Sequence, residues 1–91
     1  MNIERIKQSA IKFKFNNSDS WGIITGSRHS DIFEIMFKHG VQYDRDSAVQ
    51  GFITQEDRFV DRYEAALIAF DALQITDPSI TQLYSEDIWP G

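Results

Sequence analysis

The stretch at residues 51–73 constrains the fold of this chain more than any other. It reads GFITQEDRFVDRYEAALIAFDAL. Residues 51–54 and 58–60 predict two short strands, because apolar residues dominate each and a polar turn separates them. Asp61 then begins a helix, and Glu64 follows three residues later, as in a capping box. The stretch therefore predicts a β-hairpin that leads directly into a helix.

The helix that begins there is apolar on two faces. One stripe at helical spacing consists of Tyr63, Ala66, Leu67, Phe70 and Leu73. A second stripe consists of Ala65, Ile68, Ala69 and Ala72. A helix of this kind is normally buried on more than one side, and a 91-residue chain has little material to cover both. We therefore predict that it packs against its own sheet and against a second copy, which makes a homodimer; alanines on a hydrated flank are the alternative.

The first part of the chain predicts a second hairpin and a second helix. Residues 10–15 alternate apolar side chains with lysines, and residues 21–25 form the next apolar run. Asn, Ser and Asp between them favour a turn. A helix should follow, with Ser27 or Ser30 as its cap, and should run to about His39 before a terminating glycine.

The remaining segments complete the predicted fold. Residues 41–48 predict a polar loop that is a candidate for mobility, whereas Tyr84, Ile88 and Trp89 predict a tail that docks on its own domain or on a neighbour. We predict one α+β domain over residues 1–91. It is a small antiparallel sheet with two helices packed on one face, in the order ββαββα, plus a docked C-terminal tail.

Composition excludes several classes of protein. The chain has no cysteine, so disulfides and thiol chemistry are excluded. No apolar run approaches the ~20 residues that cross a bilayer, and the N-terminus has no secretory signal pattern. A net charge of −5 argues against binding of long nucleic acid. A core this small is only marginally stable alone, which again favours a homo-oligomer.

The sequence gives little support for a catalytic site or a metal site. His29 and His39 lie at opposite ends of one predicted helix, roughly 15 Å apart, so they cannot share a metal within one subunit. Acidic pairs at positions 44 and 46 and at 86 and 87 could hold a hard cation, but lone acidic pairs more often face solvent. No glycine-rich phosphate loop is present. We expect no enzyme activity, no cofactor and no metal.

Binding of a small anion is better supported. Arg28 and His29 stand at a predicted helix N-terminus, where the helix dipole and free N–H groups attract phosphate. Arg62 begins the second helix in a similar way, and Arg58 precedes it on the adjacent strand. Phe52 could stack on a base. Each residue also has a structural interpretation, because the arginines can pair with neighbouring acids and Phe52 can belong to the core.

Three segments resemble a known family. The strings SRHSDI, GFITQEDRFVDRYEAALIAF and LYSEDIW, within residues 26–33, 51–70 and 83–89, resemble the phage anti-Thoeris (Thoeris anti-defence) family of signal sponges. The resemblance implies a non-enzymatic protein of the host bacterial cytoplasm. It implies binding, without degradation, of cyclic ADP-ribose isomers made by bacterial TIR-domain defence enzymes. It also implies dimers with pockets at the subunit boundary, and some members assemble further and bind other cyclic oligonucleotides.

The resemblance also nominates site residues. The positions that match the family's words are Arg28, His29, Phe52, Arg58, Asp61, Arg62, Ser85, Glu86 and Asp87. We expect phosphates to meet Arg28 or Arg62, and an adenine-like ring to meet Phe52 or a tail aromatic. The chain departs from the family where the second helix ends, because Leu73 stands where a glycine is expected. The alternative function is a small acidic dimeric interaction module that inhibits a host protein, which the charge of −5 and the aromatic tail fit equally well.

Overall fold

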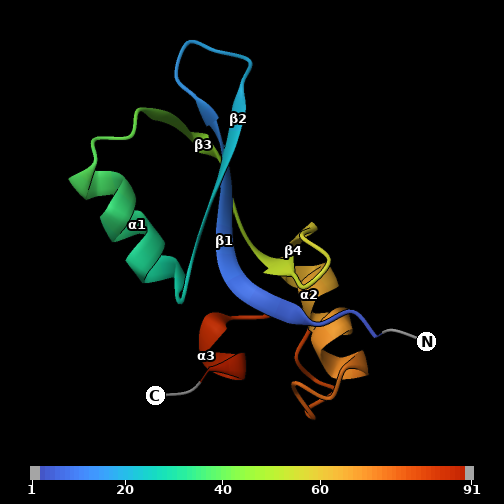
Figure 1. Ribbon diagram of the computed structural model, residues 1–91. Helices are drawn as coiled ribbons and strands as arrows, with labels where there is room; N and C mark the ends of the chain where they lie inside the picture. The colour runs from blue at the N-terminus through green and yellow to red at the C-terminus, as the bar shows by residue number, and fades with distance from the viewer. Residues whose placement is uncertain (1–2, 90–91) are drawn as a thin grey trace.

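The computed structural model describes residues 3–89 as a four-stranded antiparallel sheet with three helices (Figure 1). In chain order the elements are β1 (Ile6–Phe15), β2 (Trp21–Gly26), α1 (His29–Lys38), β3 (Tyr43–Thr54), β4 (Phe59–Asp61), α2 (Arg62–Asp71) and α3 (Ser85–Ile88). The strands lie side by side in the order β2-β1-β3-β4, and every neighbouring pair is antiparallel. The predicted α+β class and the order ββαββα are confirmed.

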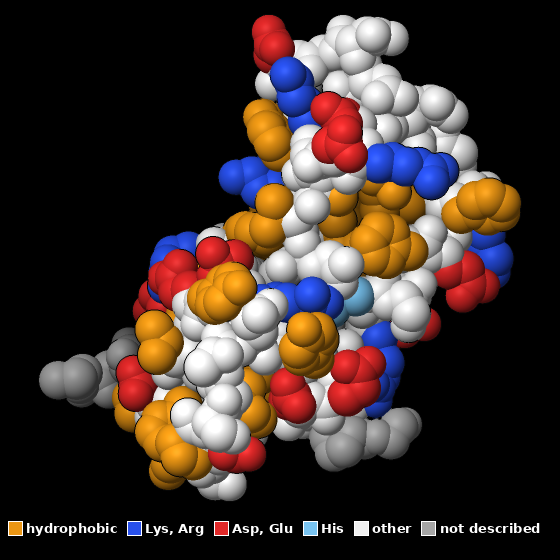
Figure 2. Space-filling view, turned by 180° about the vertical axis from the view of Figure 1, so that it is seen from behind, with side chains coloured by type: hydrophobic (Ala, Val, Ile, Leu, Met, Phe, Trp, Pro, Cys, Tyr) orange, Lys and Arg blue, Asp and Glu red, His pale blue; other side chains and the backbone are white. Residues whose placement is uncertain are grey.

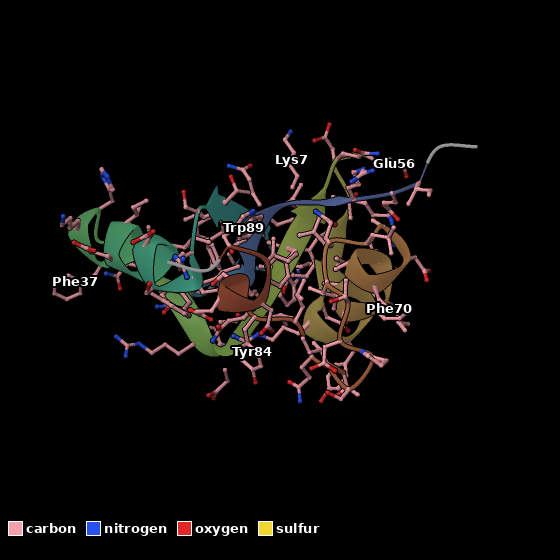
Figure 3. All side chains as sticks on the ribbon, turned by 90° about the horizontal axis from the view of Figure 1, so that it is seen from below. Lys7, Phe37, Glu56, Phe70, Tyr84 and Trp89 are labelled. Carbon is pink, nitrogen blue, oxygen red and sulfur yellow. The ribbon has the colours of Figure 1, made fainter. Side chains whose placement is uncertain are left out.

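All the helices pack on one face of the sheet. The strand register aligns Ser9 with Phe52 and Phe52 with Val60, so the helix-facing positions of β1, β3 and β4 form a row. One core cluster joins that row to α2 and the tail, and a second joins Ile11 and Phe13 of β1 to α1. Seen from below, α3 lies between α1 and α2 (Figure 3). The sheet thus holds the tail between the two longer helices.

The small side chains of α2 face the sheet. Ala65 and Ala69 are fully buried and Ala66 nearly so, because alanine lets the helix backbone approach the strands closely. The large side chains face outward: Leu67 is 70% exposed and Leu73 is 79% exposed. The helix therefore buries its alanine stripe within the chain and leaves its large apolar stripe uncovered.

The prediction of a loop at residues 41–48 is wrong, because β3 already begins at Tyr43. The register between β1 and β3 shifts between Lys12 and Lys14, which lets a polar segment pair without alternating apolar residues. Ser47 stabilises the shift, since its hydroxyl donates to the Asp44 carbonyl and accepts from the Lys14 N–H at 2.8 Å. Polar residues are tolerated there because β4 is too short to cover this part of β3.

Of the predicted N-caps of the two longer helices, one is wrong and one is confirmed. The prediction of Ser27 or Ser30 as the cap of α1 is wrong: Arg28 is the N-cap and makes no side-chain cap bond. The prediction for α2 is confirmed, because the Asp61 carboxylate accepts from the Glu64 N–H at 2.8 Å. Asp61 therefore fixes the point at which β4 turns into α2.

The C-terminal tail docks on its own domain, as predicted. Leu83 is fully buried, and its N–H donates to the Arg62 carbonyl at 2.9 Å. The carboxylate of Asp87 caps α3 by accepting from the Tyr84 N–H at 2.9 Å. Within residues 3–89, no helix has the length and apolar character to cross a membrane.

Candidate functional site

The three segments that carry the family resemblance meet around α3. We call this cluster the α3 junction; it consists of Arg28, His29, Phe52, Arg62, Tyr84, Glu86 and Trp89. One guanidinium nitrogen of Arg28 donates to the Trp89 carbonyl, and another lies 3.6 Å from the Glu86 carboxylate. Figure 2 shows a face of the molecule on which a pale-blue histidine surface lies between basic and apolar side chains. Segments distant in the sequence thus form one cluster.

His29 connects the start of α1 to the sheet through a hydrogen bond. The residue is 7% exposed, and its Nε2 lies 2.8 Å from the Gly51 carbonyl oxygen. Because a carbonyl only accepts, Nε2 carries the hydrogen. Burial lowers the pKa of His29, so the imidazole is neutral at pH 7. His29 therefore adds no positive charge for an anion and instead positions the start of α1.

Phe52 belongs to the core of the junction. Its side chain is 0% exposed, and its ring lies 5.1 Å from the His29 ring and 6.2 Å from the Trp89 ring, between centroids. This ring has no free face on which a ligand base could stack. Its position supports Trp89, which is the aromatic side chain of the tail that borders a hollow.

Arg62 lies on the other side of α3 from Trp89. Its guanidinium carbon lies 4.3 Å from the centroid of the Tyr84 ring, and Nη2 donates to Gln50 Oε1 at 2.5 Å. The Nε atom is buried and has no hydrogen-bond partner among the described residues. Figure 3 shows Tyr84 and Trp89 on opposite sides of α3. Arg62 lines a separate hollow of about 390 Å³ together with Gln50 and Gln82, whereas Arg28 lines the hollow beside Trp89. We therefore do not expect one phosphate to meet both arginines within one subunit.

Four other predicted site residues hold the fold together. Arg58 donates to Glu4 at 2.8 Å and to Glu64 at 2.7 Å, which raises the pKa of Arg58 and lowers that of Glu4. This is the structural interpretation that the sequence left open for Arg58. The carboxylates of Asp61 and Asp87 cap α2 and α3. Ser85, the first residue of α3, is 2% exposed.

The accessible part of the junction is a hollow beside Trp89. It has a volume of about 380 Å³ and is lined by Lys7, Gln8, Ser27, Arg28 and Trp89. We call it the Arg28–Trp89 hollow. Sequence reasoning missed Lys7 and Gln8, because they stand in a stretch with no clear periodicity. The aromatic character of the tail was the signal for Trp89.

The Arg28–Trp89 hollow combines the chemistry that a nucleotide needs. Two of the five N–H donors of Arg28 are directed to Trp89 and Glu86, and the Glu86 contact at 3.6 Å is longer than a hydrogen bond. Glu86 is 69% exposed, so its carboxylate can give way to a phosphate. Lys7 brings a second cation, which lies 3.7 Å from the exposed Asp57 carboxylate, and Trp89 brings a flat apolar surface. Within residues 3–89, no three histidine or acidic side chains gather as metal ligands.

A third hollow, of about 490 Å³, lies at the turn between β1 and β2. Its basic residue is Lys14, which lies 3.3 Å from the Asp19 carboxylate and opposite Asp44 in the sheet. Two carboxylates and one lysine line this hollow, whereas a lysine and an arginine without an acidic residue line the Arg28–Trp89 hollow, so the hollow at the turn is the poorer site for an anion.

Comparison with known proteins gives one family. The family model described as phage T4 y16D protein matches residues 5–89, which include every strand, every helix and the whole α3 junction. The search of curated proteins and the search of solved structures give no match. Because the family model covers nearly all of the sequence, the chain belongs to the phage T4 y16D protein family.

Proposed function

We propose that this phage protein binds and sequesters a cyclic nucleotide signal, of the cyclic ADP-ribose isomer class, in the cytoplasm of the bacterial host. The observation that carries the proposal is the Arg28–Trp89 hollow, which joins two cationic side chains to an indole ring. The resemblance of residues 26–33, 51–70 and 83–89 to signal sponges supports the same ligand class.

The charge of the hollow matches a pyrophosphate. Lys7 lies 3.7 Å from the Asp57 carboxylate and Arg28 lies 3.6 Å from that of Glu86, and both carboxylates are exposed. When they swing aside, Lys7 and Arg28 can neutralise two negative charges locally, even though the whole chain carries −5. Stacking of one base on Trp89 would contribute about 1–3 kcal/mol. The volume of about 380 Å³ lies within the range of small-molecule sites, which is roughly 300–1,000 Å³. These features favour a compact nucleotide over a polymer.

Sequestration without degradation is the mode of action we propose. The hydroxyl group lining the hollow belongs to Ser27, and a serine needs an adjacent base to act as a nucleophile. The nearby imidazole of His29 is instead buried, with Nε2 bound to the Gly51 carbonyl. Arg28 and Lys7 contribute positive charge to the hollow. The arrangement supports binding and release of an unchanged ligand.

A homodimer through α2 is part of the proposal. Tyr63, Leu67 and Leu73 are each more than half exposed, and Phe70 points away from the sheet (Figure 3). A standard interface needs about 800 Å² from each partner, and these large side chains supply an apolar centre for it. The alanine stripe lies inside the chain, so Leu67 is a better position than Ala69 at which to test the contact.

Calorimetry with cyclic ADP-ribose isomers tests the site. The wild-type protein should bind one isomer with micromolar or tighter affinity. Arg28→Ala should weaken binding about ten- to a hundredfold, since a charge-assisted hydrogen bond contributes ~1.5–3 kcal/mol. Arg58→Ala is the matched control, because it also removes an arginine but lies outside the hollow. Equal affinities of wild type and Arg28→Ala, with both proteins folded, would place the ligand elsewhere.

The second candidate function is an interaction module that inhibits a host protein. The observation that favours it is the exposure of large apolar residues far from the hollow, since Phe37 on α1 is 86% exposed and Leu73 is 79% exposed. Figure 3 shows Phe37 directed outward at the far end of α1. A pull-down that yields one stoichiometric host protein, with no copurified compound absorbing near 260 nm, would favour this function over the sponge.

A further inference from the structure

The two edges of the sheet differ in how they are protected from other strands. At one edge, β4 has only three residues, and the part of β3 that extends beyond it carries Asp44, Arg45 and Asp46 and an irregular register. Charges, shortness and irregular register are the features that keep an edge from pairing with another chain. This edge is therefore closed to strand addition.

The other edge, formed by β2, has none of these features. Its sequence WGIITG contains no charged residue and no proline, and it pairs with β1 in continuous register over all six residues. Trp21 is 52% exposed and Ile23 is 45% exposed, and both point to the sheet face that no helix covers. An apolar, regular edge strand is a template for another strand.

We propose that β2 pairs antiparallel with β2 of a second copy and joins two sheets into one of eight strands. A second copy is the partner that the edge itself favours, because the strand is uncharged and brings no like charges together across a two-fold axis. The contact is distinct from the α2 surface and goes beyond the proposed function.

The strand geometry fixes the register of this pairing. Residues opposite each other in an antiparallel pair share a face, so a continuous sheet requires positions of equal parity to meet. Centring the two-fold axis on Ile23 places Ile23 opposite its own copy and Trp21 opposite Thr25 of the copy. All three positions lie on the open face of the sheet. This register pairs residues 21–25 and keeps Trp21 within the contact, whereas centring the axis on Ile24 would pair residues 22–26 and leave Trp21 outside it.

The helices are compatible with this arrangement. Helix α1 packs on β1 and β2, so its axis lies about one strand spacing, ~4.8 Å, from the two-fold axis. The two copies of α1 would then lie about 10 Å apart, which is the ordinary distance between packed helices. Strand pairing with a small side-chain area is expected to be weak, in the micromolar range, because it falls below the ~800 Å² per partner of a standard interface.

Cysteine cross-linking tests the register directly, since the natural chain has no cysteine. Ile23→Cys should give a disulfide-linked dimer of twice 10.5 kDa on mild oxidation, because opposed residues in antiparallel strands lie within disulfide reach. Val49→Cys is the matched control: it is 40% exposed on the same sheet face but lies on β3, two strands away from the β2 edge. Trp21→Cys and Thr25→Cys should cross-link only when combined in one chain.

Cross-linking also distinguishes the β2 contact from the proposed α2 contact and from the nucleotide site. The Ile23→Cys cross-link should persist when Leu67→Glu is added, and Ile23→Lys should abolish edge pairing while leaving nucleotide affinity unchanged. Cross-linking of Ile23→Cys no faster than that of Val49→Cys would overturn the proposal. Efficient cross-linking of Trp21→Cys alone would also overturn it, because that result requires a different register.

Discussion

Gly51→Ala should be among the most damaging single-methyl substitutions in this protein. A Cβ at Gly51 would lie 2.1 Å from the Val60 carbonyl oxygen and 2.7 Å from the Phe59 ring. Contacts under 3.0 Å essentially do not occur, so β3 and β4 must separate by about 0.9 Å at that point. The carbonyl of Gly51 also accepts from His29, so the same movement disturbs the start of α1.

The size of the effect follows from two costs. Overpacking of a well-packed site costs about 1–3 kcal/mol, and a weakened ladder hydrogen bond costs about 0.5–1.5 kcal/mol more. Together they predict a loss of about 2–4 kcal/mol. A loss of that size lowers the Tm of a domain this small by about 10–25 °C. Thermal unfolding followed by circular dichroism measures it directly.

Gly40→Ala is the matched control. Gly40 has φ +62°, and an added Cβ there meets nothing within 4 Å, so its cost is only the left-handed backbone strain of about 1–2 kcal/mol. Gly51→Ala should therefore unfold at a lower temperature than Gly40→Ala. If Gly51→Ala were as stable as the wild type, the close approach of β3 and β4 would be incorrect.

Three further predictions concern charge and assembly. The free energy of unfolding should fall as the pH drops below about 6.5, because burial lowers the pKa of His29 and the unfolded chain then binds more protons than the folded one. In His29→Gln, urea unfolding should show a smaller change of this free energy between pH 7.5 and 5.5. Arg58→Ala should lower the Tm, since Glu4 and Glu64 lose their shared partner, and calorimetry should find ligand affinity unchanged. Leu67→Glu combined with Ile23→Lys, which removes the edge pairing, should give a monomer of 10.5 kDa in light scattering, and a dimer that survives both substitutions would exclude α2 as the contact.

Elements with regular patterns could be predicted from the sequence. Alternation of apolar residues with Lys12 and Lys14 identified β1, and the Asp61 cap located the start of α2. The first half of β3 could not be predicted, because its pairing depends on a register shift and on the Ser47 hydroxyl rather than on an apolar pattern. Local propensity also could not decide which stripe of α2 faces the sheet; close packing favoured the alanines.

The candidate site depends even more on tertiary contacts. Arg28 and Trp89 are 61 positions apart, and nothing in either segment alone indicates that the guanidinium meets the tail carbonyl. Phe52 was a candidate for stacking because it is an aromatic residue close in sequence to Arg58 and Arg62, yet the docking of the tail and of α2 buries it completely. Lys7 lines the hollow at the point where the register between β1 and β3 shifts, between Ile6 and Gln8, and the sequence does not reveal such a shift. The residue type identified the arginines as candidate ligands of an anion, but only the folded structure shows which of them borders a hollow.

Recovery of the bound ligand distinguishes a sponge from an enzyme. The protein is saturated with the cyclic ADP-ribose isomer that binds, separated from free ligand, incubated and then heat-denatured, and the released compound is identified by chromatography and mass spectrometry. We expect stoichiometric release of the unchanged cyclic nucleotide from the wild-type protein and almost none from Arg28→Ala. Release of a linear or hydrolysed product would make the protein an enzyme, and the absence of any retained nucleotide would contradict the sponge.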